Sequence, residues 1–252
     1  MSLTLLVMIF LIACGALWIA LFLTRPNHYP KVDLSQIDRK ALRATGEQLL
    51  CEAETWPEEL SAPGVSVASS CAPYAVRTVV YRVETDGLFE AAVQYVKNLS
   101  DCAAPRREKP DKIEETLYDQ GRGEKQHEWI RRSVHVSPPP GSNRDAVVFY
   151  VEDRPNEDTY TIAFQSVDQM DGQDIDPHEG ASRFHVNPAY FKVERAAPNR
   201  VVVRKIEAVD PCGRVSSAVN NYFISLAFFR KYMFDEAKAL AAHLSTQNRP
   251  SS

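Results

Sequence analysis

Histidine and cysteine are the residue types in this sequence best suited to bind a metal or to attack a substrate. The histidines do not show the H-E-x-x-H spacing of a zinc hydrolase, and no G-x-S-x-G turn presents a serine nucleophile. The cysteines lack the C-x-x-C spacing of a structural zinc site or a redox pair. We therefore predict no catalytic residue, no metal and no cofactor. The residues are His28, His127, His135, His178, His185 and His243, with Cys14, Cys51, Cys71, Cys102 and Cys212.

An acidic segment, residues 168–179, is the remaining candidate for a metal site. It contains five carboxylates, but Gly172 does not stand at the position that an EF-hand loop requires. We interpret the segment as an exposed acidic loop, with calcium binding as the alternative. The pairs Glu114–Glu115 and Arg106–Arg107 are likewise interpreted as solvated surface.

The overall composition is that of a globular protein with a sizeable core. Of 252 residues, 44% are apolar and 25% are charged, and sixteen prolines set against ten glycines indicate many turns. The length favours a single domain after the N-terminal segment. A net charge of -4 without a dominant basic stripe offers nothing to attract a polyanion, so we expect no nucleic-acid partner.

Residues 3–23 are an uninterrupted run of apolar or small uncharged residues. As a helix, about 21 residues at roughly 1.5 Å each span about 31 Å, the thickness of a bilayer core. We therefore predict that residues 1–24 are a single-pass transmembrane anchor. A cleaved signal peptide is the alternative, although no Lys or Arg precedes the run. A lipoprotein cleavage site at residues 11–14 is disfavoured because nine apolar or small residues follow Cys14.

Positive charges occur only after the apolar run, and the positive-inside rule therefore places the folded domain in the cytosol. They are Arg25, Lys31, Arg39, Lys40 and Arg43. Reduced thiols are expected for the four cysteines beyond the run, and disulfides in an oxidising compartment are the alternative.

The remaining chain divides into a linker, residues 25–34, and one domain, residues 35–248, with its core at about residues 49–244. The linker contains Pro26 and Pro30, and its ten residues at about 3 Å each would reach about 30 Å. Residues 35–54 are predicted to be a helix with Ser35 as its N-cap, and residues 88–99 a second helix. Strand-like runs, most of them bounded by Gly, Pro, Asn or Asp, predict strands at residues 65–69, 76–83, 115–118, 128–136, 146–152, 160–167, 190–195 and 201–209. This order of elements predicts an α+β fold with an antiparallel sheet.

A long helix is predicted over residues 215–244, where apolar residues recur at helical spacing. They are Val219, Phe223, Leu226, Met233, Ala237, Leu240 and Leu244. Over residues 222–234 the apolar surface is wider, and Arg230 and Lys231 are the only charges. We interpret this as a helix wedged between the sheet and the first helix. The alternative is a lid that also contacts a membrane.

Residues 137–145, Ser-Pro-Pro-Pro-Gly-Ser-Asn-Arg-Asp, with the strand that follows them, resemble the turn and Arg-Asp-strand junction of START (StAR-related lipid-transfer) domains. Alone, this run could equally be a surface polyproline turn or a peptide ligand. Further matches follow in the family's order at Trp56, at Gly64-Val65 with Val67, at residues 160–168, and at residues 210–215 with Val219-Asn220. Ser216 stands where proline is usual. The resemblance covers roughly residues 49–244.

The resemblance implies a helix-grip fold, in which a curved antiparallel sheet wraps the long C-terminal helix and encloses a hydrophobic cavity for one lipid. It assigns to the cavity and lid Tyr150, Phe164, Val219, Phe223, Leu226, Arg230, Met233 and Ala237. It assigns a structural role to Arg144, Asp145 and Gly213. Some members carry a buried charge where Tyr150 stands, so the neutral hydroxyl leaves the ligand open among sterol, phospholipid, ceramide and fatty acyl. Tyr150 could also face the opposite layer.

We expect from this a monomeric, membrane-tethered protein that binds or transfers lipid and is not an enzyme. Its partners would be the lipid ligand and the membrane, which the lid helix would also contact. Two alternatives stay open. One is a helix-grip enzyme of the hydrolase or cyclase type, which would need an acid–base pair inside the cavity. The other is a membrane-anchored adaptor with a vestigial cavity.

Overall fold

The computed structural model describes residues 29–71, 74, 76–100, 112–121, 126–135, 143–210 and 228–247, and within the apolar run residues 12 and 14–16. Most of the predicted anchor and the start of the predicted linker therefore lie outside the described residues. Among the residues that are described, no helix is both long enough and apolar enough to cross a bilayer.

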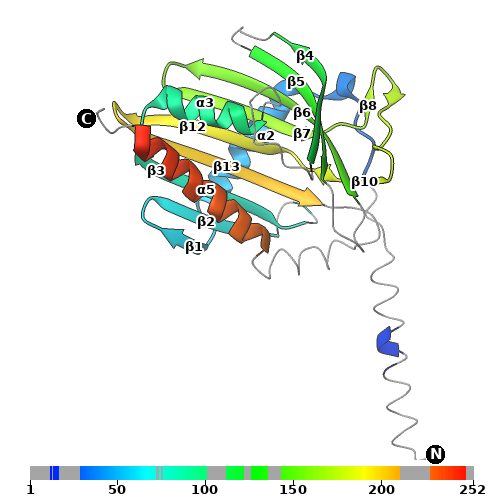
Figure 1. Cartoon of the computed structure of the whole chain (residues 1–252), viewed down its shortest axis with the longest axis horizontal. Coiled ribbons are helices and arrows are strands. Elements are labelled where there is room, and N and C mark those ends of the chain that lie inside the picture. The colour runs from blue at the N-terminus through cyan, green and yellow to red at the C-terminus, as the bar shows by residue number, and fades with distance from the viewer. Residues whose placement is uncertain are drawn as a thin grey trace, which may run out of the picture.

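An antiparallel sheet forms the centre of the fold, with its strands in the order β1-β2-β3-β13-β12-β7-β6-β5-β4 (Figure 1). These strands are β1 (Glu58–Ala62), β2 (Val65–Ser70), β3 (Thr78–Asp86), β4 (Lys112–Gln120), β5 (Gln126–His135), β6 (Asn143–Asn156), β7 (Thr159–Ser166), β12 (Ala189–Ala197) and β13 (Arg200–Asp210). Two short strands extend it, β10 (Ala181–Arg183) beside β6 and β11 (His185–Val186) beside β13. A separate hairpin joins β8 (Gln169–Met170) to β9 (Gln173–Asp174).

All eight predicted strands are confirmed, and consecutive residues of the long strands are buried, because both faces of the sheet are covered. The edge strand β1 was missed. Its sequence, Glu-Glu-Leu-Ser-Ala, holds no β-branched or aromatic residue, and its pairing with β2 decides its conformation.

The helices are η1 (Leu34–Gln36), α2 (Arg39–Ala53), α3 (Phe89–Ser100) and α5 (Phe228–Gln247). The prediction of Ser35 as N-cap of the first helix is wrong. Asp38 caps α2 by accepting the backbone N–H groups of Lys40 and Ala41, at 2.9 and 3.0 Å. Ser35 instead lies in the short turn η1, which Asp33 caps. Of the predicted terminal helix, residues 215–227 lie outside the described residues.

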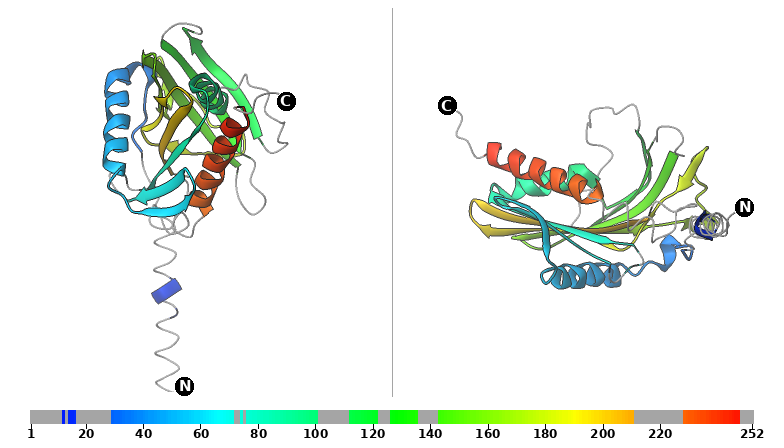
Figure 2. Two further views of the ribbon diagram at one scale, coloured as in Figure 1. Left: turned by 90° about the vertical axis from the view of Figure 1, so that its left-hand side faces the viewer. Right: turned by 90° about the horizontal axis from the view of Figure 1, so that it is seen from below.

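The helices cover both faces of the sheet, α2 on one side and α3 with α5 on the other (Figure 2). We call the face under α3 and α5 the inner face and the face under α2 the outer face. Val203 and Lys205 of β13 point to the inner face, while Ile206 packs in the outer cluster with Leu49 and Leu50 of α2. Because both faces are covered, each long strand contributes to two cores.

The Arg-Asp junction lies at the start of β6. The side chain of Asp145 is fully buried, accepts the backbone N–H of His178 at 3.0 Å, and lies 3.2 Å from Arg183 and 3.5 Å from Arg132. Arg144 lies opposite Ser182 of β10 in the sheet register. The carboxylate of Asp145 thus ties β10 and the segment before it to β5 and β6.

Residues 29–34, which belong to the predicted linker, pack against the domain. The Tyr29 ring stacks on His185, with ring centroids 3.9 Å apart, and its hydroxyl donates to the buried carboxylate of Asp210 at 2.6 Å. The Val32 carbonyl accepts the backbone N–H groups of Asp168 and Gln169, at 2.8 and 3.0 Å. This part of the segment is therefore an ordered strap across the hairpin region and is not a free leash.

Replacing Asp145 with Ala would leave Arg132 and Arg183 largely buried without their shared carboxylate. We expect D145A to lower the free energy of unfolding by about 3 kcal/mol. Urea denaturation of a fragment of residues 25–252, which keeps every contact of the described domain, measures this loss. In the matched control E90A, the lost partner is the exposed Arg154, so the loss should stay below about 1 kcal/mol. Equal losses in both variants would contradict the bracing role of Asp145.

Protonation of His185 is expected to weaken the packing of residues 29–34. Burial lowers the pKa of His185 below its usual 6.5, and the nearby carboxylates of Asp168 and Asp210 oppose this only in part. In acid the unfolded chain therefore binds a proton more readily than the folded chain, and the free energy of unfolding falls as the pH drops through 6.5. Urea midpoints between about pH 7.5 and pH 5.5 should fall less for H185Q than for the parent fragment. If the urea midpoints of H185Q and the parent fragment fall equally over this pH range, the proposed effect of His185 protonation is refuted.

Candidate functional site

A row of aromatic side chains crosses the inner face of the sheet. Trp129 of β5 stacks on Tyr150 of β6, with ring centroids 5.1 Å apart, and Tyr150 stacks on Phe164 of β7 at 5.3 Å. Phe191 of β12 continues the row at 5.8 Å from Phe164. The sheet register produces this alignment, since Trp129 lies opposite Tyr150 and Tyr150 lies opposite Phe164. The row forms an apolar wall four strands wide.

The structure brings together four of the residues assigned to the cavity and lid. Tyr150 and Phe164 are neighbours in the row, so Tyr150 faces the inner layer and not the outer one. Met233 and Ala237 are fully buried on the face of α5 that packs on the sheet, in the same cluster. The predicted Val219, Phe223 and Leu226, and the structural Gly213, lie outside the described residues.

Arg230, also assigned to the lid, is directed to the edge of the sheet. It ion-pairs with Glu59 of β1, and Glu59 also accepts the Ser69 hydroxyl at 2.8 Å and Arg77 at 3.2 Å. Burial alone would raise the pKa of Glu59, but Arg230, Ser69 and Arg77 outweigh it and hold that pKa below its usual value. Arg230 therefore fixes the start of α5 to β1 and β2.

A buried group of polar side chains adjoins the row beneath α5. Lys205 lies opposite both Phe191 and Tyr81 in the sheet, and its ammonium group is 2.8 Å from Glu207 and 3.3 Å from Glu236 of α5. Burial lowers the pKa of Lys205, but the two carboxylates outweigh it and the net shift is upward. Lys205 is therefore a charged residue in the interior, 5.1 Å from the centre of the Phe191 ring.

Tyr81 is fully buried beside this group. Burial and the carboxylate of Glu236 raise the pKa of Tyr81 well above its usual value, so the hydroxyl stays protonated. It is a buried, protonated hydroxyl beside the Glu236 carboxylate.

Arg131 is a second buried charge on the inner face, two residues along β5 from Trp129. It ion-pairs with Glu114 of β4 and donates to the backbone carbonyl of Leu99, at the end of α3, at 3.2 Å. Its Nε has no partner among the described residues. The interpretation of Glu114 as solvated surface is wrong, because its side chain is 17% exposed and faces Arg131.

Sequence reasoning missed Lys205, Glu207 and Arg131, although strand alternation carried a signal for all three. Lys205 and Glu207 are two and four residues from Val203, and Arg131 is two residues from Trp129, so each shares a face with a core residue.

A third polar group lies at the far end of the row, around His127. Its Nε2 is 2.7 Å from Asp119 and its Nδ1 is 3.9 Å from Glu152, while its ring stacks on Trp129. Glu152 also accepts the Tyr160 hydroxyl at 2.9 Å and the Lys97 ammonium at 3.2 Å. With these partners present, the carboxylate of Glu152 is already satisfied. We interpret the group as a structural network that joins α3 to the sheet.

Comparison with known proteins yields a likeness in fold. No family model matches the sequence, and no curated protein matches it. The structure of human STARD10 superposes with a TM-score of 0.61 at 22% identity, over 86% of this chain and 82% of that one. Human StAR-related lipid transfer protein 5 superposes with a TM-score of 0.56 at 16% identity, over 83% of this chain and 97% of that one. The STAR-related lipid transfer protein of Xanthomonas axonopodis superposes with a TM-score of 0.54 at 21% identity, over 75% of this chain and 98% of that one.

At these identities the likeness concerns the fold and not the activity. Each of the three proteins shares with this chain a mixed α+β architecture, with a large antiparallel sheet and a C-terminal helix. The predicted fold class is confirmed: the chain has the helix-grip fold of START domains.

Proposed function

We propose that this chain is a membrane-tethered, START-type lipid-binding protein that holds one lipid against the inner face of its sheet. The observation that carries the proposal is the aromatic row Trp129–Tyr150–Phe164–Phe191, which lies on the side of the sheet that α3 and α5 cover. An acyl chain or sterol ring laid on such a wall would leave water along its whole length. Each buried methylene returns about 0.8 kcal/mol, which offsets the cost of leaving a bilayer.

The polar end of the lipid would meet two buried polar groups beside the row. The Arg131 Nε is buried and lacks a partner among the described residues, and the Tyr81 hydroxyl lies beside the Glu236 carboxylate; buried donors are normally satisfied in native proteins. A hydroxyl, ester carbonyl or phosphate oxygen could accept from either. The two donors flank opposite ends of the row, so which of them a ligand reaches depends on its length and class.

The comparison structures support lipid binding as the function. Two of the three are named as lipid transfer proteins, and a further likeness is to human StarD13, named as a lipid transfer and protein localization domain, with a TM-score of 0.52 at 15% identity. We therefore propose a lipid as the ligand of this chain as well. The lipid, and the choice between transfer and sensing, stay open.

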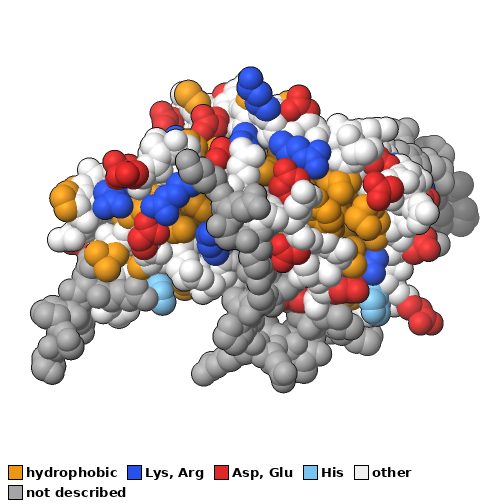
Figure 3. Space-filling model, turned by 90° about the horizontal axis from the view of Figure 1, so that it is seen from above, with side chains coloured by type: hydrophobic (Ala, Val, Ile, Leu, Met, Phe, Trp, Pro, Cys, Tyr) orange, Lys and Arg blue, Asp and Glu red, His pale blue; other side chains and the backbone are white. Residues whose placement is uncertain are grey.

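The membrane tether is part of the proposal and rests on residues 3–23, which are apolar or small and uncharged throughout. With residues 1–24 as a single-pass anchor and positive charges after it, the domain would face the cytosol as a monomer. The start of α5 would contact the membrane. On the face drawn in Figure 3, described side chains of both charge signs are interspersed.

Tryptophan emission can test lipid uptake directly. A fragment of residues 25–252 retains Trp129 in the row and Trp56, which packs in the outer cluster. We expect phosphatidylcholine with brominated acyl chains to quench most of the Trp129 emission in W56F, since the bromines would lie against the indole. The same lipid should leave Trp56 emission nearly unchanged in the matched variant W129F.

Equal quenching of both variants would indicate adsorption to the protein surface and would contradict a ligand on the inner face. No quenching by phospholipid, brominated fatty acid or brominated cholesterol would favour the adaptor alternative. Native mass spectrometry of the same fragment after exposure to a mixed lipid extract would then show whether any lipid is retained.

A further inference from the structure

The strap formed by residues 29–34 fixes one end of the domain to the chain that leads into the apolar run. Tyr29 is held through its ring by His185 and through its hydroxyl by the buried Asp210. Val32 is held on both sides, because its N–H donates to the Asp168 carboxylate at 3.1 Å and its carbonyl accepts two backbone N–H groups. Asp33 accepts the Gly172 N–H at 2.8 Å. These bonds involve backbone and buried groups, so they hold the strap in one position.

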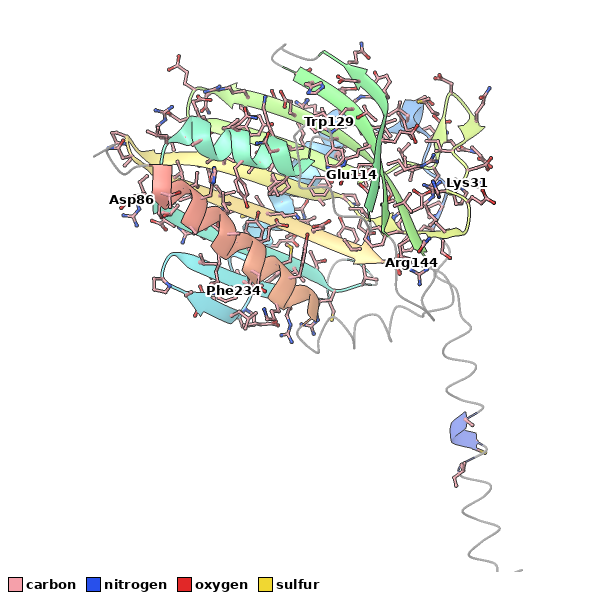
Figure 4. All side chains as sticks on the ribbon, in the orientation of Figure 1. Lys31, Asp86, Glu114, Trp129, Arg144 and Phe234 are labelled. Atoms are coloured by element: carbon pink, nitrogen blue, oxygen red, sulfur yellow. The ribbon has the colours of Figure 1, made fainter. Side chains whose placement is uncertain are left out.

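The strap lies at the end of the sheet where α5 begins. Asp210 is the last residue of β13, and Arg230 in the first turn of α5 pairs with Glu59, which also binds Ser69 near the end of β2. The C-terminal end of α5 lies at the opposite end of the strands, where the hydroxyls of Ser245 and Thr85 are 3.1 Å apart. Figure 4 shows these two opposite ends of the molecule, with Lys31 and Arg144 at one end and Asp86 at the other.

The chain between the strap and the apolar run is short. Six residue steps separate Leu23 from Tyr29, and at no more than about 3.6 Å each they reach about 22 Å when fully extended. The sheet itself is longer than this, since β3 alone runs roughly 26 Å over eight steps of about 3.3 Å. A domain held at Tyr29 therefore cannot turn its Asp86 end to a bilayer that contains residues 3–23 without straining the connection.

We propose that the strap orients the domain, so that the end bearing Asp210 and the start of α5 faces the bilayer that holds the chain's own apolar run. This inference rests on the proposed membrane anchor and goes beyond it, because an anchor alone does not define an orientation. The partner of this surface is a lipid bilayer in cis. Lipid would then enter from the same membrane that carries the protein, beside the N-terminal end of α5.

Energy transfer from labelled cysteines to the bilayer would measure this orientation. The full chain is placed in phosphatidylcholine nanodiscs that contain a rhodamine-headgroup lipid, with Cys14, Cys51, Cys102 and Cys212 replaced by Ser. A donor dye is attached either to the exposed Cys71, directly after β2 at the strap end, or to D86C in a chain that also carries C71S. We expect several-fold greater transfer from the label at position 71 than from the label at position 86.

A flexible Gly-Ser insertion of about 20 residues between Asn27 and His28 is the matched control, because it lengthens the connection and changes no residue of the domain. The two labels should then give similar transfer, and Y29A should reduce the difference between them. Equal transfer in the parent, or greater transfer from position 86, would overturn the proposed orientation. So would a parent chain that does not remain with the nanodisc. The quenching of Trp129 in the fragment of residues 25–252 does not depend on how the domain is oriented. That measurement therefore separates failure of the orientation from failure of lipid binding.

Discussion

The antiparallel pairing of β3 with β13 is the interaction on which the remaining structure depends. It runs without interruption from Asp86 opposite Arg200 to Thr78 opposite Ala208, joining strands that lie more than a hundred residues apart in the sequence. On one side of this pair β2 and β1 complete the sheet, and on the other side β12 leads to the meander that ends at β4. α5 packs across β3 and β2, and α3 packs over β12 and β13, so the inner layer exists only when this pair has formed. Closing such long loops costs conformational entropy before the pairing is gained, so we expect this pairing to slow folding.

Burial on both faces of this sheet creates the conditions for a binding site. Lys205 and Arg131 occupy positions that strand alternation turns inward, among Val203, Phe191 and Trp129. Each charge is compensated by carboxylates from a neighbouring element, Glu236 of α5 for Lys205 and Glu114 of β4 for Arg131. A buried ion pair of this kind contributes little net stability, because desolvation offsets most of the attraction. Under the proposed function, an ion pair beside the aromatic wall would position a ligand that has one polar end.

The strap and the start of α5 make the two ends of the domain different from each other, which the sheet alone does not do. Both lie at the end marked by Asp210, and both are held there by buried carboxylates, Asp210 for Tyr29 and Glu59 for Arg230. A lipid-binding domain on a loose leash would reach its own membrane and others alike. If residues 1–24 anchor the chain as proposed, a domain connected through the five residues 24–28 at a defined end would be restricted to one approach, and the geometry of the tether would become part of how the site is loaded.

The sequence by itself determined the elements and their order, because strand-like runs bounded by turn residues, and the helical spacing in α5, depend on neighbours within one segment. Eight strands, the α+β class and the burial of Met233, Ala237, Leu240 and Leu244 were all accessible in this way. Local sequence could not identify β1 as a strand, since its pairing with β2 overrides weak propensity there. The Asp38 N-cap is by contrast a local feature that was missed, because Asp is a preferred N-cap and bonds the backbone N–H groups two and three residues on. Local sequence also could not pair Glu114 with Arg131 or Glu236 with Lys205, or dock Tyr29 on His185. Only the tertiary structure decided these, because each depends on a contact between segments that the chain brings together from far apart.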